Sequence, residues 1–546
     1  MAIHPTSLRP FGAAFFLRKL FEDLLACDLQ CQCLINCQKI TPIVKGAAIL
    51  INHINHQYTD GAVEIGVSLV KHCLQKGDAK LALQHCYELL ANNSQHVQLL
   101  SFAALASRSL GWLDDAMEFI NRAVTVAPSQ PTLYCLLGDI LLMQKRPGDA
   151  LTELFKARHL GDESAQLKFN IGSAYLGLAA YEDAKVYFDR TLALDPQMVA
   201  AHVNKGLAEH SLMNLDAALD CFDAALCVDP SNVDAQWNKS HVLLTLGKYE
   251  QGFRLYETRW RHPQVALKRR RFDSKLWLGH ENLSGKTILL YAEGGFGDTI
   301  QFIRYAKLFD PDVKLIIQCQ KQLTHLVRSM GLEAKVITPG EMLPPHDFNC
   351  PLMSLPLAFK TTVDRIPSFA SYLKAPDVSV QLWQSTIEAL RGRKVGIVAR
   401  GSSSFGNDQN RSVGLPTLVK YLPHSFNYVL LQQNVSSEER AIISACDNII
   451  APAESLRSFS DTAALCEGMD LILSVDTAVA HLGAALGKQT IILIANRPDW
   501  RWGCSGDKTP WYPSVSLLRQ IGHAGWNETL MRSLPHYLDP IKLSQI

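Results

Sequence analysis

The chain has no marked excess of charge of either sign and no long apolar run. Its 53 Lys and Arg residues are balanced by 52 Asp and Glu residues, which gives a formal net charge of +1. No basic run is interleaved with aromatic residues, so the composition gives no reason to expect a nucleic acid as partner. No stretch has the uninterrupted apolar length of a membrane span, and we therefore expect no integral membrane segment.

Targeting and disulfide signals are also scarce. The apolar stretch of residues 11–26 is interrupted by four charged residues, and no clear cleavage site follows it, so it is a poor signal peptide. We expect residues 1–60 to form a helical extension of unknown role, which packs against the next domain or, alternatively, contacts a membrane surface. The 14 cysteines are scattered through 546 residues, which favours reduced thiols and a cytoplasmic location. The four cysteines between residues 27 and 37 contain no C-x-x-C pair, which favours buried small side chains over a zinc site.

Residues 61–263 repeat with a period of 34. The residues that mark the period are Pro128, Asp162, Pro196 and Pro230. Small and apolar residues recur at the same spacing inside each unit: Ala116, Ala150, Ala184 and Ala218, then Ile120, Leu154, Phe188 and Phe222, with Gly138, Gly172 and Gly206 at the expected close helix contacts. This period is that of a helix-turn-helix solenoid, and the pattern resembles the tetratricopeptide repeat. Stacked repeats leave a groove that usually holds a peptide or partner protein; a spacer or dimerisation element is the alternative, and the oligomeric state stays open.

The repeats are followed by a basic junction, which we assign to residues 264–284. Residues 247–263 are aromatic and basic, and a run of Lys and Arg occupies residues 268–271. We interpret this run as a solvated face or a seam with the next domain, with phosphate contact as the alternative.

Residues 285–375 change to an alternation of strands and helices. Residues 287–292 predict a strand, and a helix is expected from Asp298 to about Phe309. The glycine-rich turn between them contains Gly294, Gly295 and Gly297.

Two phosphate-binding motifs are incomplete in this region. The triplet of residues 285–287 resembles a P-loop, but it precedes the strand that it should follow. Ile300 occupies the place of the third glycine of a dinucleotide fingerprint. We therefore interpret the glycine-rich turn as backbone that a substrate can approach, with Asp298 fixed at a helix start. A capping box of Asp298 with Gln301 is the structural alternative.

Residues 394–546 repeat the α/β alternation after a linking segment. Residues 394–399 predict a strand, and the polar loop that follows contains Arg411. The tail of the chain contains four aromatic residues, Trp500, Trp502, Trp511 and Tyr512. We favour packing at an interdomain seam for these rings over stacking on a base.

Residues 470–495 contain the clearest signal of a binding site. They predict a strand, a helix that begins after Asp476 as its N-cap, and a second strand. In parallel sheets, a helix that begins at the carboxyl end of a strand offers N–H groups and a positive dipole end to an anion. Thr477 and His481 are four residues apart on one helix face, so we expect them to point toward the same spot. The alternative is that Asp476 only caps the helix and His481 only packs.

Two sequence blocks carry a resemblance to a known family: G-F-G-D-T-I-Q-F-I-R-Y at residues 295–305 and S-V-D-T-A-V-A-H-L at residues 474–482. With the aromatic tail, they look like bacterial tetratricopeptide-repeat glycosyltransferases. The catalytic half is similar to the lipopolysaccharide heptosyltransferases and, more distantly, to the protein O-GlcNAc transferases. The resemblance implies an α solenoid followed by an α/β GT-B fold of two Rossmann-like domains. Residues 285–375 would form the acceptor side and residues 394–546 the nucleotide-sugar side, with no metal or other cofactor.

The resemblance also implies roles for individual residues. Asp298 takes the position of the catalytic base. The D-T-G-x-x-H element that binds the donor diphosphate in this family maps onto Asp476, Thr477, Ala478 and His481, with alanine in place of the glycine. Arg411 is the candidate for the basic residue that meets the phosphates. Relatives often carry W-S-G where this chain has residues 399–401, Ala-Arg-Gly, so contacts from that position are not assigned.

These assignments predict an inverting, metal-independent glycosyltransferase that moves a sugar from a nucleotide-diphosphate sugar to an acceptor. We expect hexosyl or N-acetylhexosaminyl transfer, and the repeats favour a protein or peptide as acceptor. One alternative is a non-catalytic scaffold with a degenerate transferase domain, and another is a transferase that acts on a surface glycan. The sequence specifies neither the sugar and nucleotide nor the acceptor.

Overall fold

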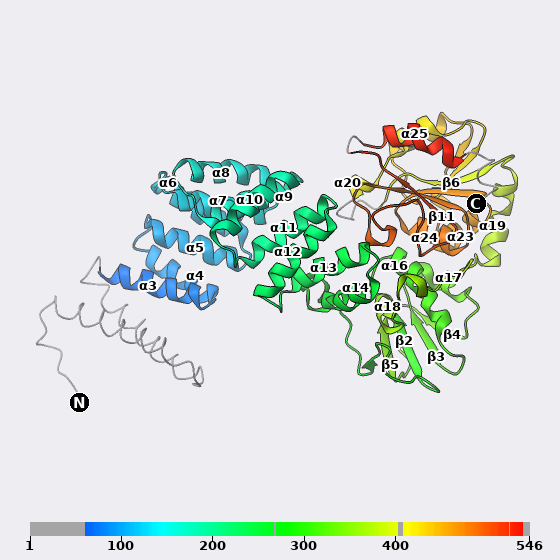
Figure 1. Ribbon diagram of the computed structural model, residues 1–546, viewed down its shortest axis with the longest axis horizontal. Coiled ribbons are helices and arrows are strands. Elements are labelled where there is room, and N and C mark those ends of the chain that lie inside the picture. The colour runs from blue at the N-terminus through cyan, green and yellow to red at the C-terminus, as the bar shows by residue number, and fades with distance from the viewer. Residues whose placement is uncertain (1–60, 267–268, 402–407, 523–524, 539–546) are drawn as a thin grey trace, which may run out of the picture. The chain divides into compact units, whose positions relative to one another are not determined.

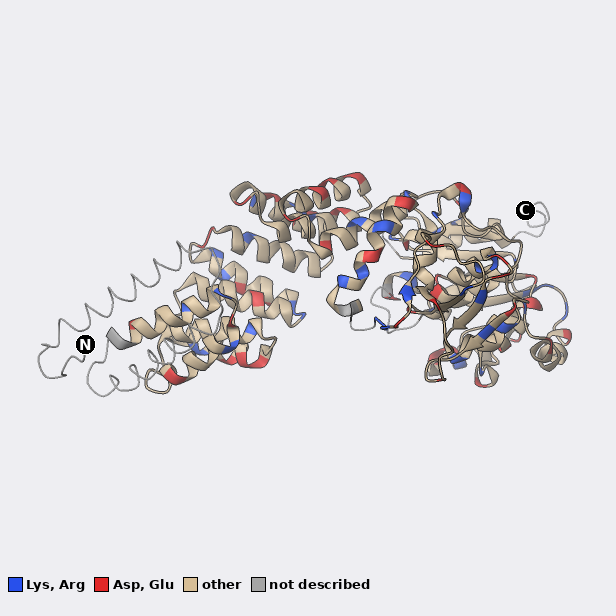
Figure 2. Ribbon diagram, turned by 90° about the horizontal axis from the view of Figure 1, so that it is seen from below, with Lys and Arg blue, Asp and Glu red and all other residues tan. Residues whose placement is uncertain are grey.

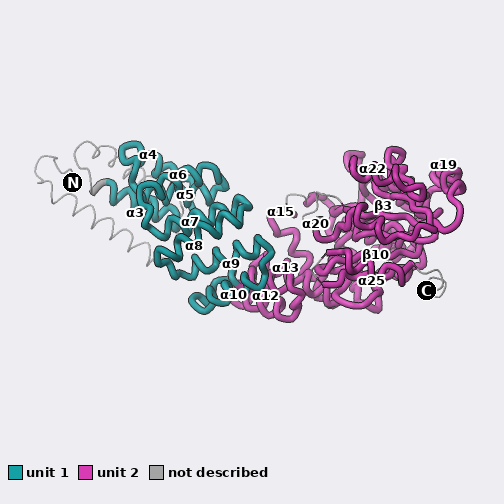
Figure 3. The backbone as a smooth tube through the Cα atoms, turned by 90° about the horizontal axis from the view of Figure 1, so that it is seen from above, with its two compact units in different colours: residues 1–201 teal, residues 202–546 magenta. Residues whose placement is uncertain are grey.

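The structure is a computed structural model that describes residues 61–266, 269–401, 408–522 and 525–538. The extension of residues 1–60, with its cysteine cluster, lies outside the described residues. The chain divides into two compact units, residues 1–201 and 202–546, which Figure 3 colours separately. None of the described helices combines the length and apolarity of a membrane span. Both signs of charge occur in each unit (Figure 2).

The first unit is a solenoid of antiparallel helix pairs (Figure 1). Its helices are α3 (Gly61–Gln75), α4 (Ala79–Leu90), α5 (Val97–Ser109), α6 (Leu113–Val126), α7 (Pro131–Met143), α8 (Pro147–His159), α9 (Ala165–Gly177) and α10 (Tyr181–Leu194). One continuous apolar core runs along these pairs, with the repeated alanines fully buried. The predicted solenoid of tetratricopeptide repeats is confirmed.

The repeated glycines lie where the two helices of a pair touch, as expected from the period. A methyl group added at Gly172 would stand 2.8 Å from the ring of Phe188, and one added at Gly206 would stand 2.6 Å from the ring of Phe222. Such distances are shorter than side-chain contacts allow. Glycine at this position therefore sets how closely the two helices of a repeat approach each other.

The second unit begins with the remaining repeat helices. These are α11 (Val199–Ser211), which starts in the first unit, α12 (Leu215–Val228), α13 (Val233–Thr245) and α14 (Tyr249–Tyr256), continued by the 3₁₀ turn η1 (Glu257–Arg261) and by α15 (Pro263–Ala266). Helix α14 packs on α13 and on the first α/β domain, so these helices share a core with that domain.

The first sheet is parallel throughout, in the order β1-β5-β2-β3-β4. Its strands are β1 (Lys275–Leu276), β2 (Thr287–Tyr291), β3 (Lys314–Gln318), β4 (Ala334–Ile337) and β5 (Phe348–Pro351). The accompanying helices are α16 (Phe296–Phe302), continued by η2 (Ile303–Leu308), then α17 (Thr324–Arg328) and α18 (Leu355–Ala358). The chain adds β3 and β4 on one side of β2 and then returns to its other side with β5, so the strand order reverses between β2 and β5.

The second sheet is also parallel, in the order β11-β10-β9-β6-β7-β8. Its strands are β6 (Lys394–Val398), β7 (Asn427–Leu430), β8 (Ile449–Ile450), β9 (Leu471–Val475), β10 (Thr490–Ile494) and β11 (Val515–Arg519). Its helices are α19 (Asp377–Glu388), α20 (Asp408–Arg411), α21 (Leu415–Leu418), α22 (Ser437–Ser444), α23 (Phe459–Glu467), α24 (Ala478–Ala485) and α25 (Asn527–Leu538). The order reverses between β6 and β9. Two parallel sheets with helices give the expected GT-B type α/β fold.

The aromatic tail packs inside the second unit, as the sequence favoured. Trp500, Trp502, Trp511 and Tyr512 are all buried. The indole N–H of Trp511 donates a 3.1 Å hydrogen bond to the hydroxyl of Tyr249 on α14. The tail therefore joins the second α/β domain to the last repeat helix.

Candidate active site

A cavity of about 370 Å³ lies where the strand order of the second sheet reverses. We call it the switch-point cavity. Its walls include three basic residues, Arg400, Arg411 and Arg457, together with the first residues of two helices. Phe296 and Gln322 of the first α/β domain also line it, so the cavity lies between the two sheets. Ligands of open α/β sheets bind at this kind of reversal.

Two helix N-termini face the switch-point cavity. Helix α23 begins after Ser458 and helix α24 begins after Thr477, and both N-cap residues line the cavity. Helix N-termini present unpaired N–H groups and a partial positive charge. Combined with the three arginines, they make this cavity suited to a phosphate-bearing ligand.

The predicted diphosphate-binding residues divide between two cavities. Thr477, Ala478 and Arg411 line the switch-point cavity. Asp476 instead lines a neighbouring cavity of about 170 Å³. The N-cap of α24 is Thr477, one residue later than predicted.

The neighbouring cavity, which we call the junction cavity, lies between repeat helices and the second sheet. His210 of α11 and His241 and Thr245 of α13 line it together with Asp476 and the loop of residues 497–502. Arg411 lines this cavity as well as the switch-point cavity, so its side chain stands at the boundary between them. Repeat helices therefore contribute directly to the surroundings of the site.

The side chain of Arg411 is held by hydrogen bonds to Asp408 and to the backbone of Asp476. Its Nε donates to a carboxylate oxygen of Asp408 at 2.9 Å, and its Nη1 donates to the backbone carbonyl of Asp476 at 2.9 Å. The side chain is only 16% exposed. This arginine therefore stands at the start of α24, and its contact with a phosphate stays a prediction.

The two partly buried carboxylates of the junction cavity, Asp476 and Asp499, differ in their tendency to bind a proton. Burial, reinforced by the negative charge of Asp499, raises the pKa of Asp476 to about 6. Burial also acts on Asp499, but the charge and hydrogen bonds of Arg501 outweigh it and hold the pKa of Asp499 below its usual value. Asp499 is therefore the carboxylate of the pair that stays ionised more readily.

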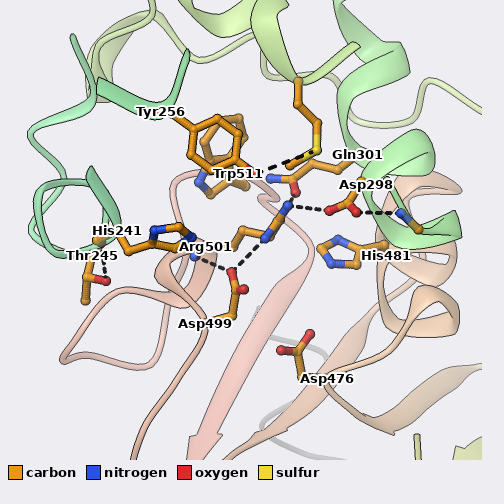
Figure 4. Close-up of polar contacts among 12 residues, drawn as sticks. His241, Thr245, Tyr256, Asp298, Gln301, Asp476, His481, Asp499, Arg501 and Trp511 are labelled. Atoms are coloured by element: carbon orange, nitrogen blue, oxygen red, sulfur yellow. Dashed lines mark hydrogen bonds and ion pairs between the residues drawn. The ribbon is translucent and has the colours of Figure 1, made fainter. Parts of the chain in front are cut away.

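Asp298 lies at the start of α16 with both carboxylate oxygens engaged (Figure 4). Oδ2 accepts the N–H of Gly295 at 2.7 Å, and Oδ1 accepts a 2.5 Å hydrogen bond from Arg501. Asp298 lines neither cavity, although Phe296 of the same turn lines the switch-point cavity. Its side chain is 27% exposed.

The predicted capping box of Asp298 with Gln301 is wrong. Asp298 caps Gly295, whereas the side chain of Gln301 accepts a hydrogen bond from Arg501. Arg501 is nearly buried and also donates to Asp499 at 2.9 Å. This arginine therefore connects Asp298 to the loop that lines the junction cavity.

In the glycine-rich turn, two glycines lie so close to other protein atoms that a side chain would not fit. A methyl group at Gly294 would collide with the carboxylate of Asp298, and one at Gly297 would stand 3.0 Å from the ring of His481 and 3.6 Å from Cα of Ala478. Gly295 has more space. The backbone at Gly294 thus lies close to Asp298, and the backbone at Gly297 lies close to helix α24. These contacts explain both glycines without the predicted approach of a substrate.

His481 is packed behind the site. It is 5% exposed, its ring stacks on Trp502 with centroids 5.1 Å apart, and its Nδ1 is hydrogen-bonded to the hydroxyl of Tyr512 at 2.8 Å. It lines neither cavity, so the prediction that Thr477 and His481 point toward the same spot is wrong. Burial lowers the pKa of His481 to about 3, so the ring is neutral at physiological pH.

Three residues near the site were missed in the sequence. Arg501 and Asp499 belong to the aromatic tail, which was considered only for its rings. Ser458 was not singled out; it is the N-cap of α23, and the carboxylate of Asp461, the third helical residue, accepts its backbone N–H. The S-x-x-D spacing of a capping box was the available signal.

Glu293 is a fourth residue that the sequence did not single out. It follows β2, and its Oε1 accepts hydrogen bonds from Arg259 at 3.2 Å and from the N–H of Met353 at 3.1 Å. Its Oε2 is buried and has no hydrogen-bond partner among the described residues. Burial raises the pKa of Glu293 to about 7, although Arg259 opposes the shift.

We expect Glu293 to make the protein less stable as the pH rises from about 4.5 to 7. In that interval the folded state holds a proton that the unfolded chain releases, so the free energy of unfolding falls with rising pH. Glu293→Gln should remove this contribution. Urea unfolding at several pH values measures it, with the exposed residue change Glu333→Gln as control. Parallel pH profiles for wild type and Glu293→Gln would contradict the assignment.

Family models match one segment in the repeats and one segment in the C-terminal part of the chain. Residues 432–525 match glycosyltransferase family 9 (heptosyltransferase), and residues 169–226 match the tetratricopeptide repeat. Protein FlbA of Caulobacter vibrioides is 24% identical over 430 residues, which are 73% of this chain and 71% of that protein.

Solved structures match about a third of the chain. PilW, a type IV pilus biogenesis factor, is 17% identical with a TM-score of 0.34 and covers 37% of this chain and 93% of its own. A thermophilic tetratricopeptide-repeat protein of Thermus thermophilus is 22% identical with a TM-score of 0.31 and covers 33% of this chain and 99% of its own. The matched families account for the two kinds of architecture: the chain carries tetratricopeptide repeats followed by a C-terminal glycosyltransferase family 9 domain.

Proposed function

We propose that this glycosyltransferase moves a sugar, with inversion, from a nucleotide-diphosphate sugar to a polypeptide held by the repeats. The observation that carries the proposal is the switch-point cavity, where two helix N-termini and Arg411 converge. The donor diphosphate would lie against Thr477 and Ala478. The nucleoside would extend along the ends of β6 and β7, where Gln433 and Leu456 complete the wall.

Asp298 is the proposed general base. It stands next to Gly297, which approaches α24 closely, so the carboxylate and the start of α24 belong to neighbouring parts of the cleft. Its hydrogen bonds with Arg501 and with the N–H of Gly295 hold the carboxylate in one orientation before substrate arrives. When an acceptor hydroxyl or amide attacks the anomeric carbon, Asp298 would take its proton, and the carbon–oxygen bond to the diphosphate would break on the opposite face.

The leaving diphosphate gains negative charge in this step. The N–H groups at the start of α24 and the guanidinium of Arg411 are already in place to stabilise it. We therefore propose that transfer needs no metal ion. His481, being neutral and buried, would act only by positioning α24.

The junction cavity supports a polypeptide acceptor. Its lining by α11, α13 and the loop of residues 497–502 joins the repeats to the transferase domain, and Arg411 connects it to the switch-point cavity. An extended segment bound along helices α11 and α13 of the second unit would thus be led toward the donor. The combination of repeats and transferase supports hexosyl or N-acetylhexosaminyl transfer, as in the protein O-GlcNAc transferases that the sequence resembles.

A donor panel tests the proposal. Full-length protein is incubated with UDP-, GDP- and ADP-linked sugars, including ADP-heptose, and release of nucleoside diphosphate is followed. We expect slow hydrolysis of one donor, together with a gain of one sugar mass on a co-expressed client protein in intact-protein mass spectrometry. A chain that neither binds nor hydrolyses any donor would be the non-catalytic scaffold. Modification of a glycan without any change in protein mass would overturn the polypeptide acceptor.

A further inference from the structure

A third cavity, of about 560 Å³, lies on the first sheet and takes no part in the proposed reaction. Its lining includes three consecutive arginines, residues 269–271, together with Trp260, Tyr291 and Asn349. It shares no residue with the switch-point cavity or the junction cavity. We call it the arginine cavity.

The arginine cavity occupies a face of the sheet that is packed by loops. Tyr291 pairs with Pro351 and Leu289 pairs with Asn349 in the register of β2 and β5, so these four side chains share one face. The side chains that pack on the apolar part of this face are Phe272 and Leu343, which both come from loops. Parallel sheets usually carry helices on both faces, so this face is less covered than is typical.

The cavity lies where the strand order of the first sheet reverses, a position at which open α/β sheets bind ligands. Tyr291 ends β2 and Pro351 ends β5, and the strand order of the first sheet reverses between these two strands. The switch-point cavity has the same relation to the second sheet. The two cavities therefore occupy corresponding places in the two α/β domains.

The arginines of this cavity have aromatic and amide neighbours among the described residues. The guanidinium of Arg269 lies 5.7 Å from the ring centroid of Trp260, and Arg270 donates a hydrogen bond to the side chain of Gln318. Within the described part of the chain, no carboxylate forms an ion pair with any of the three. The nearby Glu293 is instead paired with Arg259.

We propose that the arginine cavity binds a small organic oxyanion, a sugar phosphate or a sugar acid, independently of the donor. Guanidinium groups present a planar fork that matches phosphate and carboxylate oxygens. The volume falls in the range of about 300–1,000 Å³ that is usual for small-molecule sites. Asn349 and Ser274, hydrogen-bonded to each other at 2.9 Å, add polar groups for hydroxyls.

The test is calorimetry on the full-length protein with glucose 6-phosphate, glucuronate and neutral glucose. We expect an acidic sugar to bind and glucose not to bind. The double variant Arg269→Gln/Arg271→Gln should weaken binding by about tenfold or more, since it removes charge-assisted hydrogen bonds. Both side chains are exposed, so the fold should persist. Lys275→Gln, an exposed basic residue outside the cavity, is the matched control and should bind as wild type does.

Two further measurements test whether the acidic sugar binds in the arginine cavity. Binding should change tryptophan fluorescence, and Trp260→Phe should abolish that change while calorimetric binding persists. Arg411→Gln should leave the affinity for the acidic sugar unaltered, which separates this site from the donor site. A preference for either phosphate or carboxylate would support the proposal and name the ligand's acid group. Absence of binding, equal binding of glucose, or loss of binding in Arg411→Gln but not in the double variant would overturn it.

Discussion

Asp298→Asn should lower the rate of sugar transfer by about 10²- to 10⁴-fold, the usual contribution of a positioned general base. Asparagine keeps the shape of the side chain and can still accept the N–H of Gly295, so the start of α16 should persist. It cannot take a proton from the acceptor. Single-turnover assays with saturating donor measure the rate, and calorimetry should show donor affinity within about twofold of wild type, because Asp298 does not line the donor cavity.

Two other variants sharpen this prediction. Asp377→Asn changes an exposed carboxylate at the start of α19 and should leave transfer unchanged. Gly294→Ala should reduce transfer without touching the chemical group, because the added methyl would displace the carboxylate of Asp298. If Asp298→Asn retained nearly full turnover while Asp476→Asn lost it, the base would be Asp476, whose pKa of about 6 and place in the junction cavity would then explain the reaction.

The repeats and the alternation of strands and helices were predictable because each depends on local periodicity. Gly172 and Gly206 are 34 residues apart, and the period predicts that they have equivalent neighbours. In the structure, both lie against a phenylalanine ring of the second helix of their repeat. The buried strands β9 and β10 are short apolar runs of the kind that parallel sheets require. The domain boundaries at residues 263, 285 and 375 stay predictions.

The orientation of side chains around the site was less predictable. His481 and Thr477 have the spacing of one helix face, but α24 is short and packs closely against α16, so the face that contains His481 is buried. Helical spacing indicates which residues are neighbours on a helix. It does not indicate which of them a second element will cover.

Long-range partners were not predictable at all. Arg501 reaches Asp298 across 203 positions of the chain, and no local pattern connects the two residues. Likewise, the linking segment before residue 394 contains helix α19, whose Trp383 donates a hydrogen bond to Asp461. Such pairs arise only when segments that are distant in the sequence pack against each other.

Arg411→Gln should weaken donor binding by about 10- to 100-fold. This corresponds to the loss of one charged hydrogen-bonding group, worth about 1.5–3 kcal/mol. Calorimetric titration with the donor identified by the panel, or with its nucleoside diphosphate, measures the change. Arg440→Gln, an exposed arginine paired with Glu454 outside both cavities, is the matched control. Unchanged donor affinity in Arg411→Gln would remove this residue from the site.

The other two arginines of the switch-point cavity should respond differently, and the difference identifies Arg411 as the phosphate ligand. Arg400 is held by two hydrogen bonds, of 2.9 and 3.1 Å, to the carboxylate of Glu439, which is buried. Arg400→Gln should therefore cost folding stability, because it leaves a buried carboxylate without its cation, and should change donor affinity less. Arg457 is exposed, so its charge is screened by solvent, and Arg457→Gln should weaken the donor by less than Arg411→Gln. A reversed order of the three affinities would move the diphosphate away from the start of α24.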